Sequence, residues 1–393
     1  MNPNVETPYY GYVDFARFYR RHAYFRLDLA RPDHRFSSTH RSAVELLEVE
    51  IDDAKHSHWG TLRAGGWIAV GIKPGSSQDG TRGRYYRYER PEDYTETPAA
   101  PIEVVPRYLG GTPTHFANQF RVDASNVSID CLQPFEQMPA KLAVNVVNVG
   151  QASCIAMLGL SGGVEAYFDV GWPICGNAKT RPSSLQFCTT NNPPVILSHW
   201  DMDHWAGANV DPLLLEVPWV VPTLAGLSKS AAEVARILAQ NGNLFVWSDQ
   251  PNIVRTTSSG ISIARARGST RNHSGLVIQV HEAQGLDVLC PGDCDYRKLP
   301  NFSTRPSVLV VSHHGGYFIG TVPPKAIANG WHVVSYGQGN TYNHPHRAAM
   351  AGLGGQGWTD RRDTPNGTVS IATQCFSAPC NRPHCVASST QHF

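Results

Sequence analysis

Residues 198–207 read Ser-His-Trp-Asp-Met-Asp-His-Trp-Ala-Gly and follow a short apolar run at 194–197. The stretch places four potential metal ligands within six residues: His199, Asp201, Asp203 and His204. Imidazole nitrogens and carboxylate oxygens together suit zinc, or manganese when oxygens dominate. Because adjacent residues such as Asp203 and His204 cannot point the same way in regular structure, a tight turn would direct them toward two different ions. The alternative is a solvated acidic loop whose two histidines are bonded elsewhere.

Further donors follow apolar runs elsewhere in the chain, where strands are expected to end. They are Asp169, Asp293, His313, His314 and His344. Two neighbouring cations need a bridging carboxylate, and Asp293 is the candidate for it. Any one of these side chains could instead cap a helix or bond a carbonyl group in the core. Their joint occurrence at strand ends favours a single site.

Strands and helices alternate from residue 142 onward. Apolar and β-branched runs predict strands near residues 142, 154, 165, 194, 261, 275, 287, 307, 332 and 368. A helix is expected over 230–242, where Ser230 and Glu233 form a capping box and Gly242 is a stop signal. Many strands with interspersed helices predict an α/β (α+β) fold in which two sheets are covered by helices.

Residues 1–138 differ in character and predict a smaller β-rich N-terminal module of unknown role, ahead of a second domain over 139–393. The segment 74–113 is rich in Pro, Gly, Ser, Arg and Tyr and has little helical periodicity. Basic and aromatic residues interleave over 82–90 and 15–26, a pattern that can grip phosphates and stack bases. Solvated strand faces and core aromatics are the favoured account of the same pattern.

Composition narrows the function classes only a little. With a formal net charge of +1 the chain has no global attraction to nucleic acid or to anionic membranes. It has neither an apolar run long enough to span a membrane nor a signal-peptide core, so we expect a cytoplasmic protein with no membrane contact. Its nine cysteines are scattered and odd in number, which indicates mostly reduced thiols. One C-terminal group of side chains could form a small zinc site or consist of unpaired thiols, and the sequence allows both. The group is Cys375, Cys380, His384 and Cys385.

Six motifs in one order resemble a known family. They are VNVVNVGQAS (144–153), YFDVG (167–171), SHWDMDHWAG (198–207), PGD (291–293), VSHHGG (311–316) and SYGQGN with YNHPH (335–346). This series resembles the metallo-β-lactamase-fold hydrolases, in particular the cytoplasmic hydrolase domain of bacterial DNA-uptake (competence) channel proteins and the choline-phosphate esterases. The resemblance covers about residues 142–373 and implies an αββα sandwich.

The resemblance also implies two divalent ions, Zn or Mn, and a role for each motif residue. Asp169 would orient the ligand turn. One ion would be held by His199, Asp201 and Asp293. The other would be held by Asp203, His204, Asp293 and His314. The implied catalytic residues are Asp203, His313 and His344, with Asn340 in support beside His344.

Two departures from the family pattern stand out. Ala152 and Ser153 occupy the place of the usual glycine and aspartate, so an acidic residue normally near the site is missing. The usual third-motif histidine has no clear equivalent: His273 falls near that place, but relatives of this subgroup tend to have asparagine there, as Asn272 could be. We therefore leave His273 out of the expected ligand set.

The function implied first is that of a metal-dependent hydrolase, a dinuclear phosphodiesterase or nuclease that acts on DNA or RNA through a metal-activated water. One alternative is hydrolysis of a small ester, lactone, β-lactam or nucleotide, because this fold hosts many chemistries. Another is a regulatory or binding subunit of a multi-protein system, such as a defence system. The expected partners are nucleic acid and, through residues 1–138, another protein.

Overall fold

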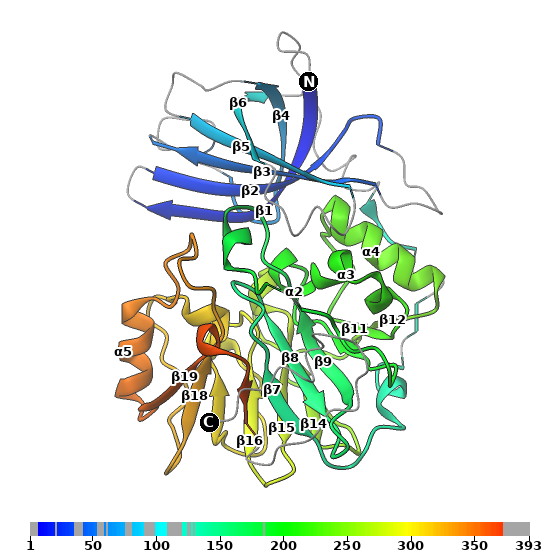
Figure 1. The fold of residues 1–393 in the computed structure, drawn as a ribbon, viewed down its shortest axis with the longest axis vertical. Coiled ribbons are helices and arrows are strands. Elements are labelled where there is room, and N and C mark those ends of the chain that lie inside the picture. The colour runs from blue at the N-terminus through cyan, green and yellow to red at the C-terminus, as the bar shows by residue number, and fades with distance from the viewer. Residues whose placement is uncertain are drawn as a thin grey trace. The chain divides into compact units, whose positions relative to one another are not determined.

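The computed structural model describes residues 7–19, 22–34, 42–52, 59, 62–74, 81–89, 99–107, 120–123, 127–128, 130–183 and 185–371. The chain divides into two compact units (Figure 1). The first comprises residues 1–124 together with 224–237, and the second comprises residues 125–223 and 238–393. Among the described residues, no helix has both the length and the apolar character needed to cross a membrane.

The first unit contains a closed β-barrel, which confirms the smaller β-rich N-terminal module. Each strand pairs antiparallel with its neighbours. The order around the barrel is β1 (Thr7–Tyr19), β2 (His22–Ala30), β3 (Val44–Ile51), β5 (Thr81–Tyr88), β6 (Ala99–Arg107) and β4 (Trp67–Pro74). Closure satisfies the backbone hydrogen bonds that an open sheet leaves free at its edges.

Strand β5 carries the basic and aromatic stretch, and it separates the two kinds of side chain. Tyr86 is buried and donates a 2.6 Å hydrogen bond to Glu48, whereas Arg82 is exposed and lies 3.0 Å from Asp52. Arg82 and Tyr86 are four residues apart and therefore lie on the same face of β5, so strand alternation does not account for the burial of Tyr86. Among the basic and aromatic side chains of the described stretch, the arginines are exposed and the tyrosines are buried, while Arg90 lies outside the described residues.

The second unit contains two seven-stranded sheets. The order of the first sheet is β12 (Leu244–Val246), β11 (Trp219–Val221), β10 (Val195–Ile196), β9 (Val164–Val170), β8 (Cys154–Leu158), β7 (Ala143–Val146) and β20 (Val369–Ser370). The order of the second is β13 (Val254–Thr256), β14 (Ile261–Arg265), β15 (Leu276–His281), β16 (Asp287–Cys290), β17 (Val308–Val310), β18 (Trp331–Val334) and β19 (Asp360–Asp363). The strands expected from residue 142 onward are all present.

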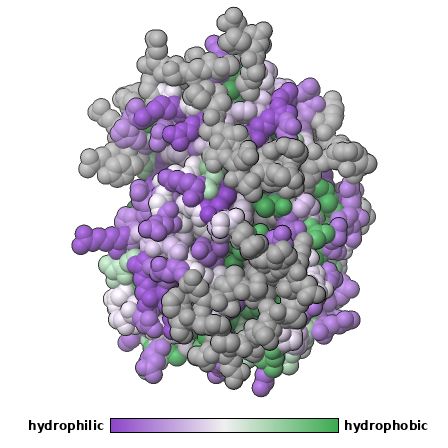
Figure 2. Space-filling view, viewed as in Figure 1, coloured by the Kyte–Doolittle hydropathy of each residue, from purple (hydrophilic) through white to green (hydrophobic). Residues whose placement is uncertain are grey.

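The two sheets share one apolar core. Val144 and Phe168 of the first sheet belong to the same buried cluster as Ile278 and Val288 of the second. The surface in Figure 2 is mainly hydrophilic or neutral where it is coloured, with hydrophobic residues in small separate areas. Most of the apolar side chains of the strands are buried.

Helices cover the outer faces of this sandwich (Figure 1). Helix α2 (Met202–Trp205) contacts β9 of the first sheet and is followed by α3 (Gly207–Val210). Helix α5 (Arg347–Gly355) packs Leu353 into a second cluster with Leu309 and Val334 of the second sheet. The expected αββα sandwich is confirmed.

The helix expected over 230–242 is α4 (Lys229–Gln240), but the predicted capping box is wrong. Ser228 accepts a hydrogen bond from the Ala231 backbone N–H, so it takes the capping role two residues earlier. The Ser230 hydroxyl instead donates to Asp28 of the barrel at 3.0 Å. A buried carboxylate far away in the sequence thus outcompetes the local pairing of Ser230 with Glu233.

The six described cysteines are buried thiols: Cys131, Cys154, Cys175, Cys188, Cys290 and Cys294. Burial raises the pKa of the Cys290 and Cys294 thiols, which lie on either side of Asp293, so both stay protonated near neutral pH. The C-terminal group of Cys375, Cys380, His384 and Cys385 lies outside the described residues.

Candidate metal centre

The loop 198–207 starts after β10 and includes α2, and its close backbone contacts depend on Gly171, Gly275 and its own Gly207. A Cβ atom at Gly171 would lie 1.8 Å from the carbonyl oxygen of Asp203. At Gly275 it would lie 2.2 Å from the carbonyl oxygen of Ser198, and at Gly207 it would lie 2.3 Å from that of Val170. Neighbouring strands approach the loop this closely only because these positions lack a side chain.

Asp169 anchors the same loop from the end of β9. It is fully buried, has a φ of 60°, and accepts hydrogen bonds from the Ser198 backbone N–H at 2.7 Å and the Ser198 hydroxyl at 2.9 Å. Its second oxygen also lies 2.7 Å from Nδ1 of His204. Asp169 therefore holds both the start of the loop and one ring of the candidate ligand set, while its carboxylate belongs to neither of the two donor groups described below.

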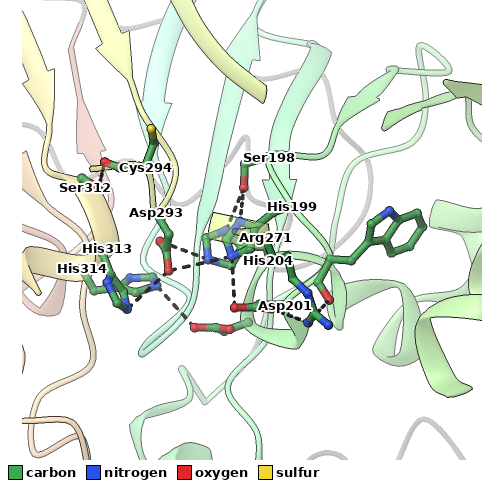
Figure 3. Close-up of polar contacts among 12 residues, drawn as sticks. Ser198, His199, Asp201, His204, Arg271, Asp293, Cys294, Ser312, His313 and His314 are labelled. Atoms are coloured by element: carbon green, nitrogen blue, oxygen red, sulfur yellow. Dashed lines mark hydrogen bonds and ion pairs between the residues drawn. The ribbon is translucent and has the colours of Figure 1, made fainter. Parts of the chain in front are cut away.

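In each of three imidazole rings, Nδ1 is held by a polar contact and the other nitrogen points into the candidate metal centre (Figure 3). Nδ1 of His314 donates to the Ser335 carbonyl at 2.9 Å. The single hydroxyl hydrogen of Ser198 goes to Asp169, so its oxygen accepts from Nδ1 of His199 at 3.0 Å. Together with His204, these rings direct Nε2 into the centre, and that is the nitrogen each ring would offer to a metal ion.

The three Nε2 atoms are buried and make no well-aligned hydrogen bond in the described structure, although each lies 3.2 to 3.5 Å from a carboxylate oxygen. A buried polar atom without a partner costs on the order of 1–3 kcal/mol, so native proteins rarely leave three of them together. Coordination to a cation satisfies such atoms. This set of residues therefore fits a bound divalent ion.

Two groups of side chains have ligand atoms that all lie within 4.8 Å of one another: His199, His204 and Asp293, and Asp203, His204 and His314. The carboxylate of Asp293 lies between rings, with one oxygen 3.3 Å from Nε2 of His204 and the other 3.9 Å from Nε2 of His199. Asp203 lies 3.5 Å from Nε2 of His314. The structure thus brings together five of the six expected ligands.

The sixth expected ligand, Asp201, lies beside these groups and pairs with an arginine. One oxygen of Asp201 is 3.2 Å from Nε2 of His199, and the other accepts a 2.5 Å hydrogen bond from Nη1 of Arg271. Burial lowers the pKa of Arg271 to about 10, so the guanidinium stays charged at neutral pH. The sequence did not predict a role for Arg271. Its position two residues before His273 was the only feature that could have pointed to it.

His313 and His344 lie next to the donors. The positive φ values of His313 and His314, 52° and 54°, form a turn that directs both rings to the centre. Nε2 of His313 is 3.5 Å from Asp293, and its ring centroid is 5.2 Å from that of His344. Asn340 accepts from the His344 backbone N–H at 3.0 Å and donates to its carbonyl at 2.7 Å. Asn340 therefore shapes the turn that carries His344.

Gln151 is a second residue that sequence reasoning missed. Its side-chain nitrogen lies 3.4 Å from Nδ1 of His344, and its carbonyl oxygen accepts from the Gly337 backbone N–H at 3.1 Å. At the neighbouring position where an acidic residue is missing, the Ser153 backbone N–H donates to the Asp203 carbonyl at 2.9 Å. This turn therefore supports the centre through amide groups.

His273 lies near the centre and belongs to neither donor group. Its Nδ1 accepts a 3.2 Å hydrogen bond from the Asp295 backbone N–H. Burial lowers the pKa of His273, which keeps the ring neutral.

The electrostatic field of the centre favours positive charge. Burial alone would lower the pKa of His204, but the carboxylates of Asp293 and Asp169 outweigh it and raise the pKa well above its ordinary value. Burial would likewise raise the pKa of Asp293, but the rings of His313, His204 and His199 hold it well below its usual range. A carboxylate that stays ionised inside a buried pocket of histidines suits a cation.

No known protein family and no curated protein matches the chain. Among solved structures, a mutant of the CmlA beta-hydroxylase matches at 15% identity over 60% of this chain and 52% of that chain, with a TM-score of 0.29. Zn(2+)-bound PqqB from Methylobacterium extorquens matches at 13% identity over 56% of this chain and 87% of that chain, with a TM-score of 0.33. Both TM-scores are below 0.5.

Proposed function

We propose that the chain is a metal-dependent hydrolase of the metallo-β-lactamase fold, with its hydrolase domain over residues 139–393 and an accessory module over 1–138. One observation carries the proposal: the buried Nε2 atoms of His199, His204 and His314 converge, without well-aligned hydrogen bonds, on the carboxylates of Asp203 and Asp293. A structural histidine cluster would satisfy these nitrogens within the protein. In a metal centre, these nitrogens would instead coordinate the ion.

A divalent ion held by these side chains would act as a Lewis acid, making a water nucleophilic near neutral pH and offsetting negative charge in the transition state. The side chains of the protein orient the metal ligands and the attacking water. Asp169 fixes the tautomer of His204, and Ser335 fixes that of His314. Asp203 is the carboxylate that we assign to orient the attacking water, because it lies on the partly accessible side of the ligand loop.

We propose a phosphodiester as the substrate, with DNA or RNA as the first choice. His313 and His344 form a second pair of rings beside the ligands, and imidazole N–H groups bind phosphoryl oxygens well. Burial lowers the pKa of His313, so we assign it as a neutral hydrogen-bond donor to a substrate oxygen. The similarity of the motifs to DNA-uptake proteins supports nucleic acid over other phosphodiesters.

A small ester or lactone is the second candidate, and a specific surface favours it. The segment after the His-His-Gly-Gly turn exposes Tyr317 (50% exposed) and Ile319 (82% exposed). Phe318 between them has its ring 5.5 Å from that of His313. An apolar acyl or aryl group could pack on this segment while its ester group lies at the centre.

A test of the hydrolase should measure metal content and cleavage together. We would determine bound metal by mass spectrometry and then assay single-stranded, double-stranded and circular DNA, RNA, bis(p-nitrophenyl) phosphate and p-nitrophenyl acetate in Mn²⁺ or Zn²⁺. The inactive variants are Asp203→Ala and His204→Ala. A matched control is His281→Ala, because that exposed ring pairs only with Asp287 among the described contacts.

Cleavage of the phosphodiesters by the wild type and by His281→Ala, with loss in both site variants, is the expected result. Cleavage of the acetate ester alone would favour the second candidate. Bound metal with no hydrolysis of any substrate would favour a regulatory or binding subunit, and absence of bound metal would contradict the proposed function.

A further inference from the structure

The two donor groups share one ligand, His204. Its Nδ1 lies 2.7 Å from Asp169, so Nε2 is the only nitrogen that it offers to a metal. One lone pair coordinates one cation. The group of His199, His204 and Asp293 and the group of Asp203, His204 and His314 therefore compete for the same atom.

Once one ion uses His204 with Asp203 and His314, the other position retains His199 and Asp293 and lacks a third protein donor. Asp201 is the carboxylate at hand, because one of its oxygens lies 3.2 Å from Nε2 of His199. Occupancy of this second position by a cation therefore depends on how freely Asp201 can contribute its negative charge.

Arg271 already forms an ion pair with Asp201 and so neutralises its negative charge. Its Nη1 is 2.5 Å from Asp201 Oδ1 and 3.4 Å from the Trp200 carbonyl oxygen. Asp201 is 7% exposed, and the side chain of Arg271 is 19% exposed, so water screens the pair weakly. A dication beside His199 would meet a carboxylate that is already neutralised and a guanidinium that repels it. Figure 3 shows the ion pair beside the histidines.

We infer that Arg271 takes the place of one of the two cations. The centre binds one divalent ion tightly through Asp203, His204 and His314, while the position between His199 and Asp201 binds a second ion only weakly. This inference rests on the proposed metal dependence and changes its expected stoichiometry from two ions to one. Arg271 is in this sense a positioning residue that holds Asp201.

The test is equilibrium binding of Mn²⁺ to the metal-free full chain, read from free Mn²⁺ by electron paramagnetic resonance. The wild type should bind one ion tightly and a second ion about tenfold or more weaker. Arg271→Met removes the charge and should strengthen the second site by about tenfold or more, giving a spectrum of two coupled ions. Arg271→Lys keeps the charge and should retain the wild-type pattern.

Arg265→Met is the matched control, since Arg265 donates to the Ser274 carbonyl at 3.0 Å and forms no described ion pair with the centre. It should bind Mn²⁺ as the wild type does. Circular dichroism establishes that each variant is folded. If Arg271→Met does not fold, Arg271→Gln carries the same expectation, because glutamine can still donate a hydrogen bond to Asp201.

Two equally tight ions in the wild type would overturn the inference and leave the proposed hydrolase standing. A second site that is unchanged in a folded Arg271→Met or Arg271→Gln variant would also overturn it. A wild type that binds no Mn²⁺ or Zn²⁺ would overturn both the inference and the proposed function, so the two failures are distinct.

Discussion

The Asp169 carboxylate lies 2.7 Å from Nδ1 of His204, although 35 residues separate the two in sequence. The same carboxylate accepts two hydrogen bonds from Ser198 at the start of the ligand loop. This contact gives His204 one free nitrogen, and that nitrogen faces Asp293 at 3.3 Å. The ring is therefore oriented for coordination before any ion arrives.

Asp169→Asn should weaken metal binding by about 10- to 100-fold, because the amide lacks the charge that makes the Nδ1 hydrogen bond strong and raises ligand basicity. Calorimetric titration of the metal-free protein with Zn²⁺ measures the change. Asp287→Asn is the control, since Asp287 pairs with the exposed His281 away from the ligands. An unchanged affinity in Asp169→Asn would remove Asp169 from the metal-supporting role.

Arg271→Met should destabilise the metal-free protein by about 3 kcal/mol, because it leaves the Asp201 carboxylate buried without its cation. Urea denaturation in the presence of a chelator measures the loss. Addition of Mn²⁺ should restore stability to this variant more than to the wild type, since the ion replaces the missing positive charge. Equal effects of Mn²⁺ on the two proteins would contradict this account.

Gly171→Ala should remove metal binding and lower the free energy of unfolding by about 1–3 kcal/mol, because the new Cβ would lie 1.8 Å from the Asp203 carbonyl oxygen and displace the loop. Gly354→Ala is the control, because a Cβ there meets no atom within 4 Å. We would compare thermal unfolding and bound metal in both variants. Full metal content in Gly171→Ala would show that the loop tolerates the displacement.

Removal of metal by a chelator should lower the melting temperature reversibly. An ion present at 100 times its dissociation constant stabilises the folded state by about 2.7 kcal/mol, provided that it does not bind the unfolded chain. Differential scanning calorimetry before and after chelation, and after Zn²⁺ is restored, measures this shift. His204→Ala should abolish the shift and His281→Ala should keep it; a shift that persisted in His204→Ala would place the ion elsewhere.

Several expectations remain predictions. They are the kinship with DNA-uptake proteins and choline-phosphate esterases, the domain boundary near residue 138, the cytoplasmic location, the nucleic-acid or protein partner and the roles of the site residues. The basic and aromatic stretch of β5 illustrates why sequence alone is ambiguous about a partner. Its tyrosines are buried, and Arg82 already pairs with acidic residues.

The sequence by itself determined the elements and the inventory of donors. The apolar runs of the sandwich strands follow from two-sided burial, which leaves a local signal in every strand. The residue type likewise determines which ligand atom a side chain can offer to a metal. Side chains that follow consecutive strands meet at one edge of a sheet. This is why His199, Asp203, His204, Asp293 and His314 could be proposed as one site before their distances were known.

Only the tertiary structure decided how those donors are shared. The pairing of Asp201 with Arg271 joins residues 70 positions apart, and the contact of Ser230 with Asp28 joins residues 202 positions apart. Neither leaves a periodic or local pattern, because each depends on the packing of separate elements. The energy of a buried charge depends on every group within a few ångströms, and those groups become known only when the chain is folded.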